Sequence, residues 1–125
     1  MLNYDGSRQQ DLPVDDWLKT LGIESLCQWD TIVFLDRHPS ILVGTEYIAR
    51  LLGYAAAEVL AALDSLKTSG LVEYSRVSQE VRFYQVTASA DATRRDAWDR
   101  LMTLADSRTA RLLLARRLRG RDRPE

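Results

Sequence analysis

The chain has 125 residues, of which 46% are hydrophobic and 28% are charged, and its net charge is −1. This length and balance are those of one globular domain, and no apolar run approaches the roughly 18 residues that span a membrane. The polar N-terminus lacks the pattern of a secretion signal and the single cysteine, Cys27, excludes an internal disulfide, so we expect a cytoplasmic protein.

The charge is unevenly distributed along the chain. Residues 1–107 contain ten basic and sixteen acidic side chains, whereas residues 108–125 contain seven arginines and two acids. A basic tail of this kind can bind an acidic partner. Alternatively, the arginines compensate the negative end of a C-terminal helix. This second interpretation is favoured by the leucines of the same segment, namely Leu112, Leu113, Leu114 and Leu118.

Two helices are predicted in the first third of the chain. Residues 1–10 offer little to bury and are expected to form a flexible arm. A short helix is predicted from Asp11 to Leu21 and should end at Gly22. A second is predicted from Glu24 to Arg37, where apolar residues recur at three- and four-residue steps. Its expected cap is Ser25, and a short β-prone run follows at residues 41–43.

The stretch from Thr45 to Val72 predicts a helix, a tight turn and a second helix. Thr45 is expected to cap the first helix, which ends at Gly53. Its predicted buried stripe consists of Ile48, Leu51 and Leu52. The second helix is predicted from about Ala55 to Ser69, because Val59, Leu63 and Leu66 fall on one line of the helix surface.

The remaining chain predicts a hairpin followed by helical structure. Residues 71–76 and 81–86 are β-prone, and residues 77–80 form a short connector between them. From about Ser89 to Arg119 the pattern is helical, as one long helix or as two with Ser107 capping the second. The expected buried positions of this segment are Trp98, Leu101, Ala105, Leu112 and Ala115.

This order of elements predicts an α+β fold in a single domain over residues 11–119, followed by a tail at residues 120–125. Four features carry a resemblance: Thr45, the stretch Ile48–Gly53, the line of Val59, Leu63 and Leu66, and Gly70-Leu71-Val72 leading into a hairpin. Through them, residues 25–87 resemble the winged helix-turn-helix of MarR-like bacterial transcriptional regulators. The resemblance implies a mostly helical fold with a small β-hairpin wing and a long C-terminal helical segment over residues 89–119.

The resemblance also implies a function. It implies a transcriptional regulator that works as a homodimer through its terminal helices and places its second helix in the major groove of duplex DNA. The exposed side of helix 55–69 nevertheless carries alanines with Glu58 and Asp64, so any DNA contact should be mainly to phosphates. The candidate residues for that contact are Lys67, Arg76, Arg82, Arg116 and Arg117.

An alternative function follows from the same helix face. Its small apolar residues, Ala57, Leu60 and Ala61, would let another helix approach closely, and an exposed apolar strip is usually covered. The face would then contact either the terminal helices of the same chain or a protein partner. A third interpretation is that alanine is simply a strong helix former on a solvated face.

The sequence predicts neither catalytic residues nor a metal or cofactor site. It contains one histidine and one cysteine, which excludes a Cys/His metal cluster. Cys27 and His38 lie at opposite ends of one predicted helix, about 16 Å apart at 1.5 Å per residue, too far for a nucleophilic pair within the helix. We therefore expect a protein that is not an enzyme.

Overall fold

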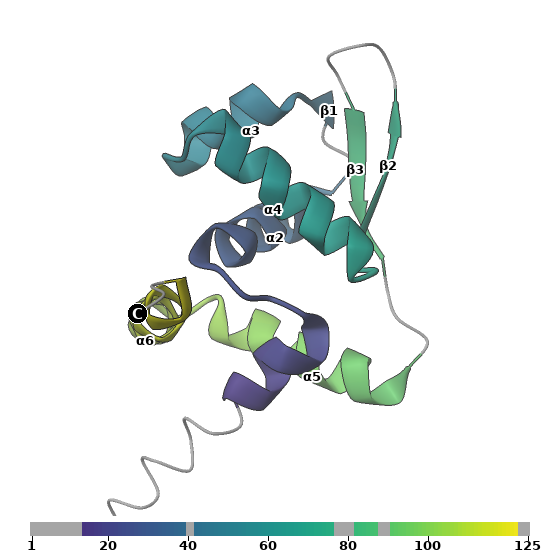
Figure 1. Ribbon diagram of the computed structural model, residues 1–125. Coiled ribbons are helices and arrows are strands. Elements are labelled where there is room, and N and C mark those ends of the chain that lie inside the picture. Colours follow the sequence, from purple (N-terminus) through teal and green to yellow (C-terminus); the bar gives the residue numbers. More distant parts are fainter. Residues whose placement is uncertain (1–13, 40–41, 77–81, 88–90, 123–125) are drawn as a thin grey trace, which may run out of the picture.

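The computed structural model describes residues 14–39, 42–76, 82–87 and 91–122, and within them the fold is α+β, as predicted (Figure 1). The predicted arm at residues 1–10 and the connector at residues 77–80 lie outside the described residues. A helix over residues 14–21 comes first. It is followed by α2 (Leu26–Arg37), β1 (Leu42–Val43), α3 (Thr45–Leu52), α4 (Ala56–Thr68), β2 (Val72–Arg76), β3 (Arg82–Val86), α5 (Ala92–Leu104) and α6 (Arg108–Asp122).

The helix ends follow local sequence signals with one exception. The Ser25 hydroxyl accepts a hydrogen bond from the backbone N–H of Gln28 at 3.1 Å and caps α2, as predicted. Gly53 ends α3 in the left-handed region, with φ of 83°. The prediction that Thr45 caps α3 is wrong, because the extended residue before the helix is Gly44 and Thr45 already belongs to the first turn.

Gly22 allows the first helix to end directly against α4. Its φ of 79° is in the region that favours glycine. A Cβ atom at this position would lie 2.7 Å from the Oγ atom of Ser69. The sequence therefore places its smallest residue where the end of the first helix and the end of α4 come closest.

The hairpin is confirmed, and a third strand extends it into a small sheet. The strand order is β1-β3-β2, and both pairings are antiparallel. In the hairpin, Tyr74 pairs with Tyr84 and Arg76 pairs with Arg82. The short strand β1 adds to the other edge of β3, where Leu42 pairs with Phe83. The sheet thus joins the chain on both sides of the α3–α4 pair.

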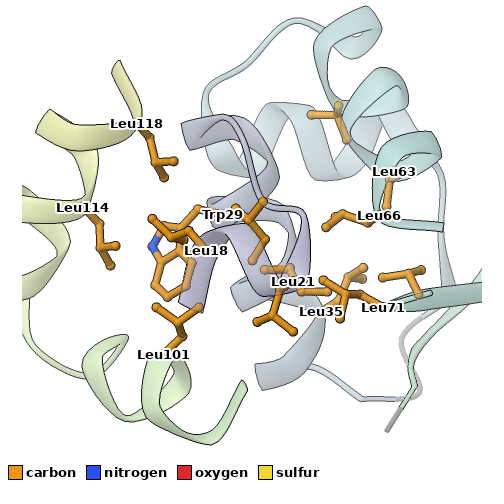
Figure 2. Packing of buried hydrophobic residues seen from close by; sticks show 14 of the residues in the cluster. Leu18, Leu21, Trp29, Leu35, Leu63, Leu66, Leu71, Leu101, Leu114 and Leu118 are labelled. Atoms are coloured by element: carbon orange, nitrogen blue, oxygen red, sulfur yellow. The ribbon is translucent and has the colours of Figure 1, made fainter. Parts of the chain in front are cut away.

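Helix α2 lies at the centre of the fold. It packs against α3, α4 and β3 on one side and against α6 on the other (Figure 1). Trp29 of α2 is buried and joins the two halves of one hydrophobic core. Figure 2 shows its indole beside Leu18, with α5 and α6 contributing further leucines. The labelled core residues of those two helices are Leu101, Leu114 and Leu118, and those of α4 are Leu63 and Leu66.

One predicted buried position in α3 is wrong. Ile48 and Ala49 are buried and Leu52 is partly buried, but Leu51 is exposed. The three inward residues span an arc of about 100° on the helix surface, and Leu51 falls about 60° outside it. Leu51 therefore points to solvent, although its spacing from Ile48 is helical.

The C-terminal segment consists of two helices. The helical structure is interrupted between Leu104 and Arg108. The Ser107 hydroxyl accepts a hydrogen bond from the backbone N–H of Ala110 at 3.1 Å and caps the second helix. Helix α6 continues to Asp122, past the predicted end at residue 119. The prediction that Leu112 is buried is wrong, because its side chain is 62% exposed. The interruption before Arg108 shifts which residues of α6 face the core.

Candidate functional site

The outward face of α4 is an exposed helix surface made of small and apolar side chains. Ala57, Leu60 and Ala61 are all exposed, and the Leu60 side chain is 43% open to solvent. This follows from helical geometry, because the opposite side of α4 faces the core. The residues of that buried side are Val59, Ala62, Leu63 and Leu66.

The described terminal helices do not cover this face. Helices α5 and α6 lie on the other side of α2 from α4 (Figure 1). The prediction that the chain's own terminal helices could cover Ala57, Leu60 and Ala61 is therefore wrong for α5 and α6. The other predicted contact of this face, with a protein partner, stays a prediction.

Acidic side chains flank the face. Glu58 and Asp64 are exposed on either side of Ala61. The Glu58 carboxylate accepts a hydrogen bond from the backbone N–H of Ala55 at 3.1 Å, which holds it at the helix N-terminus, where negative charge is favourable. The one basic side chain of α4, Lys67, is exposed in its last turn. The first turns of α4 thus present negative charge and small apolar surface.

A groove of about 640 Å³ runs between α2 and α4 beside this face. Its walls come from α2, from the turn between α3 and α4, from α4 itself and from one residue of α6. The residues that matter for its chemistry are Cys27, Asp30, Tyr54, Glu58, Ala61 and Arg111.

Asp30 connects three parts of the fold at the end of this groove. Its carboxylate accepts a hydrogen bond from the Tyr54 hydroxyl at 2.7 Å and forms an ion pair with Arg111 at 2.8 Å. The Asp30 side chain is only 13% exposed. Burial, together with the charge of the Asp30 carboxylate and the hydrogen bond that it accepts from the hydroxyl, raises the pKa of Tyr54 well above the ordinary tyrosine value. Asp30 therefore links α2 to the α3–α4 turn and to α6.

The raised pKa of Tyr54 should be visible in the absorbance of the protein at high pH. The folded chain favours the neutral phenol of Tyr54, which therefore adds to the free energy of unfolding below the unfolded tyrosine pKa of about 10. This contribution is lost as the pH rises through the pKa of the folded state. Among the five tyrosines, Tyr54 should still be protonated at a pH where an ordinary tyrosine has ionised. Phenolate absorbance measured against pH should lose a late step in Tyr54→Phe, and Asp30→Asn should move that step to lower pH. A late step of unchanged size in Tyr54→Phe would contradict the assignment.

The five predicted DNA-contacting residues fall into separate groups. Arg76 and Arg82 are backbone partners at the end of the hairpin, and their side chains lie outside the described residues. Arg116 and Arg117 belong to α6, which lies across α2 from the hairpin (Figure 1). Lys67 is in the last turn of α4, which leads into β2. The structure brings the two hairpin arginines together but separates them from the two arginines of α6.

Arg117 has a partner in the first helix. Its guanidinium forms a two-pronged ion pair with the Asp15 carboxylate. The two residues are 102 positions apart, so no local sequence pattern indicates this pair. Arg116, by contrast, is exposed.

The chain matches no protein-family model, and no curated protein is significantly similar to it. Across the described ranges, no three His, Cys, Asp or Glu side chains gather in a group that could hold a metal ion. None of the helices in the described part of the chain is long and apolar enough to cross a membrane.

Proposed function

We propose that this chain is a cytoplasmic, non-enzymatic regulatory protein of the winged-helix type that binds protein through the outward face of α4. The observation that carries the proposal is the exposure of Leu60 beside Ala57 and Ala61. An apolar strip of this kind on a helix is a common protein-contact surface.

The order of the elements supports the winged-helix assignment. Helices α3 and α4 are joined by a tight turn at Gly53, and α4 leads through Gly70 into the β2–β3 hairpin. In this assignment α4 is the second helix of the helix-turn-helix and the hairpin is the wing. Helices of this position read DNA in many regulators.

The charge on α4 favours protein over DNA as its target. Phosphates approaching the outward face would meet Glu58 and Asp64, which have the wrong sign. Alanine can touch a thymine methyl group, but it offers no hydrogen bond to a base edge. The face of α4 therefore lacks both of the usual elements of DNA recognition.

A transcriptional regulator that holds DNA through the hairpin is the second candidate. It is supported by the register, which places Arg76 directly opposite Arg82 at the end of the hairpin. These two positions would contact phosphates without base readout, whereas Lys67 lies at the opposite end of the hairpin, where α4 leads into β2.

The two candidates are separated by a titration of random-sequence duplex DNA, followed by fluorescence anisotropy at about 50 mM salt, where phosphate contacts are strong. A protein-binding α4 predicts no binding of the duplex under these conditions. Binding that weakens steeply as salt is added, and that Lys67→Glu or Arg76→Glu reduces, would establish the second candidate instead. The matched control is Lys19→Glu, an exposed lysine of the first helix.

A further inference from the structure

The outward side of α6 carries a single large apolar side chain between two arginines. Leu112 is 62% exposed, and Arg108 and Arg116 are exposed four residues before and after it. Residues four apart lie on one side of a helix, so the three form one stripe. The other side of α6 is buried through Leu114 and Leu118. The stripe is therefore a leucine knob flanked by positive charge.

Two other arginines of α6 are already engaged within the chain. Arg111 pairs with Asp30 and Arg117 pairs with Asp15. These ion pairs hold α6 in one rotation about its axis, because Asp30 belongs to α2 and Asp15 belongs to the first helix. The rotation they fix is the one that turns Leu112 outward.

The outward face of α4 has the complementary shape. Ala57, Leu60, Ala61 and Asp64 are all exposed, and their spacing is i, i+3, i+4 and i+7. Four residues with this spacing surround a hole of the kind that accepts one side chain from a facing helix. We call these four residues the α4 diamond. Its two alanines let the facing backbone come close.

The charges around the knob and the α4 diamond are also complementary. Asp64 is part of the diamond, and Glu58 lies on its other side. Arg108 and Arg116 are eight residues apart, about 12 Å along the helix, and Glu58 and Asp64 are six residues apart, about 9 Å. Long arginine side chains can bridge this difference.

The same charges disfavour pairing of like with like. Two α6 stripes placed together would bring Arg108 and Arg116 of both copies into contact. Two α4 faces would do the same with Asp64 and Glu58. Like charges brought together in this way oppose association. A contact between α6 and α4 joins opposite charges instead.

The knob and the α4 diamond cannot meet within one chain, because α6 and α4 lie on opposite sides of α2 (Figure 1). A second copy supplies the missing half of each contact. Because the knob and the α4 diamond are two different surfaces, the contact is of the head-to-tail kind and leaves one surface of each kind free to bind a further copy.

We propose, resting on the function proposed above, that the partner of the α4 face is a second copy of this chain. Leu112 of one copy packs into the α4 diamond of the other. Arg108 and Arg116 of the first copy lie against Glu58 and Asp64 of the second.

Sedimentation equilibrium of the full chain tests this contact with one variant on each side. The wild type should form dimers and, at higher concentration, larger head-to-tail assemblies. Ala61→Arg fills the hole and adds a repelling charge, and Leu112→Asp removes the knob. Each should weaken self-association by about 30-fold or more, as truncation of a central interface residue does. The matched control, Leu51→Asp, changes an exposed leucine of α3 and should leave the dimer unchanged.

The decisive arm mixes the two variants. An Ala61→Arg chain keeps its knob and a Leu112→Asp chain keeps its hole, so the equimolar mixture should regain one intact contact and form a heterodimer. This recovery also shows that both variants are folded. A mixture that stays monomeric, or a wild type that is monomeric, overturns the inference. Neither result would produce DNA binding, so failure of the function proposed above is detected separately by the duplex titration.

Discussion

Replacing Trp29 with alanine should lower the free energy of unfolding by about 3–5 kcal/mol, the range for removing a large buried aromatic side chain. Trp29 is fully inside the core and packs beside Leu18, between the half formed by α3, α4 and the sheet and the half formed by α5 and α6 (Figure 2). The loss is a large share of the roughly 5–15 kcal/mol that stabilises a typical domain. Urea unfolding followed by far-UV circular dichroism measures it.

Trp98→Ala is the matched control for this experiment. Trp98 lies on α5 and is only partly buried against the core. Its removal should therefore cost less than removal of Trp29. An equal loss for the two variants would contradict the central position of α2 in the fold.

The second large effect is expected at Asp30. Asp30→Ala removes the acceptor shared by Tyr54 and Arg111, and hydrogen bonds to a charged group contribute about 1.5–3 kcal/mol each. We expect a loss within that range, because the Arg111 side chain is partly exposed and can find water when its partner is gone. Urea unfolding again gives the value.

An exposed ion pair elsewhere in the chain supplies the comparison for Asp30. Asp96 and Arg100 lie four residues apart on α5, and both side chains are more than half exposed. Asp96→Ala should cost no more than about 0.5 kcal/mol, the upper end for such helix pairs. If Asp96→Ala were as harmful as Asp30→Ala, the link from α2 to α6 would not contribute as the geometry indicates.

The sequence predicted most of the helices and strands because their signals are local. Ser25 caps α2 and Gly53 ends α3 through contacts that span only a few residues. The β2–β3 hairpin likewise follows from two neighbouring β-prone runs. The errors at Thr45 and Leu51 concern single positions, where a shift of one residue changes the role of a side chain.

Contacts between distant residues could not be predicted in this way. Asp30 and Arg111 are 81 residues apart, and no periodicity relates them. The same holds for Asp15 and Arg117. The exposure of Leu112 also escaped prediction, because the break before Arg108 resets the helix phase.

The candidate face of α4 was partly accessible from sequence. Helical periodicity predicts that Ala57, Leu60 and Ala61 point away from the buried line. Whether another helix covers them depends on where α5 and α6 pack, which only the three-dimensional arrangement shows. The complementary knob at Leu112 could be recognised only after the rotation of α6 was known.

Cysteine cross-linking tests the contact between Leu112 and the α4 diamond most directly. An Ala61→Cys chain and a Leu112→Cys chain, both carrying Cys27→Ser, are mixed and oxidised. A disulfide requires the two Cβ atoms to come within about 4.5 Å, which the packed helices allow. We predict that the disulfide-linked heterodimer forms faster than either homodimer. Homodimers that form as readily as the heterodimer would contradict the packing of α6 on α4 of a second copy.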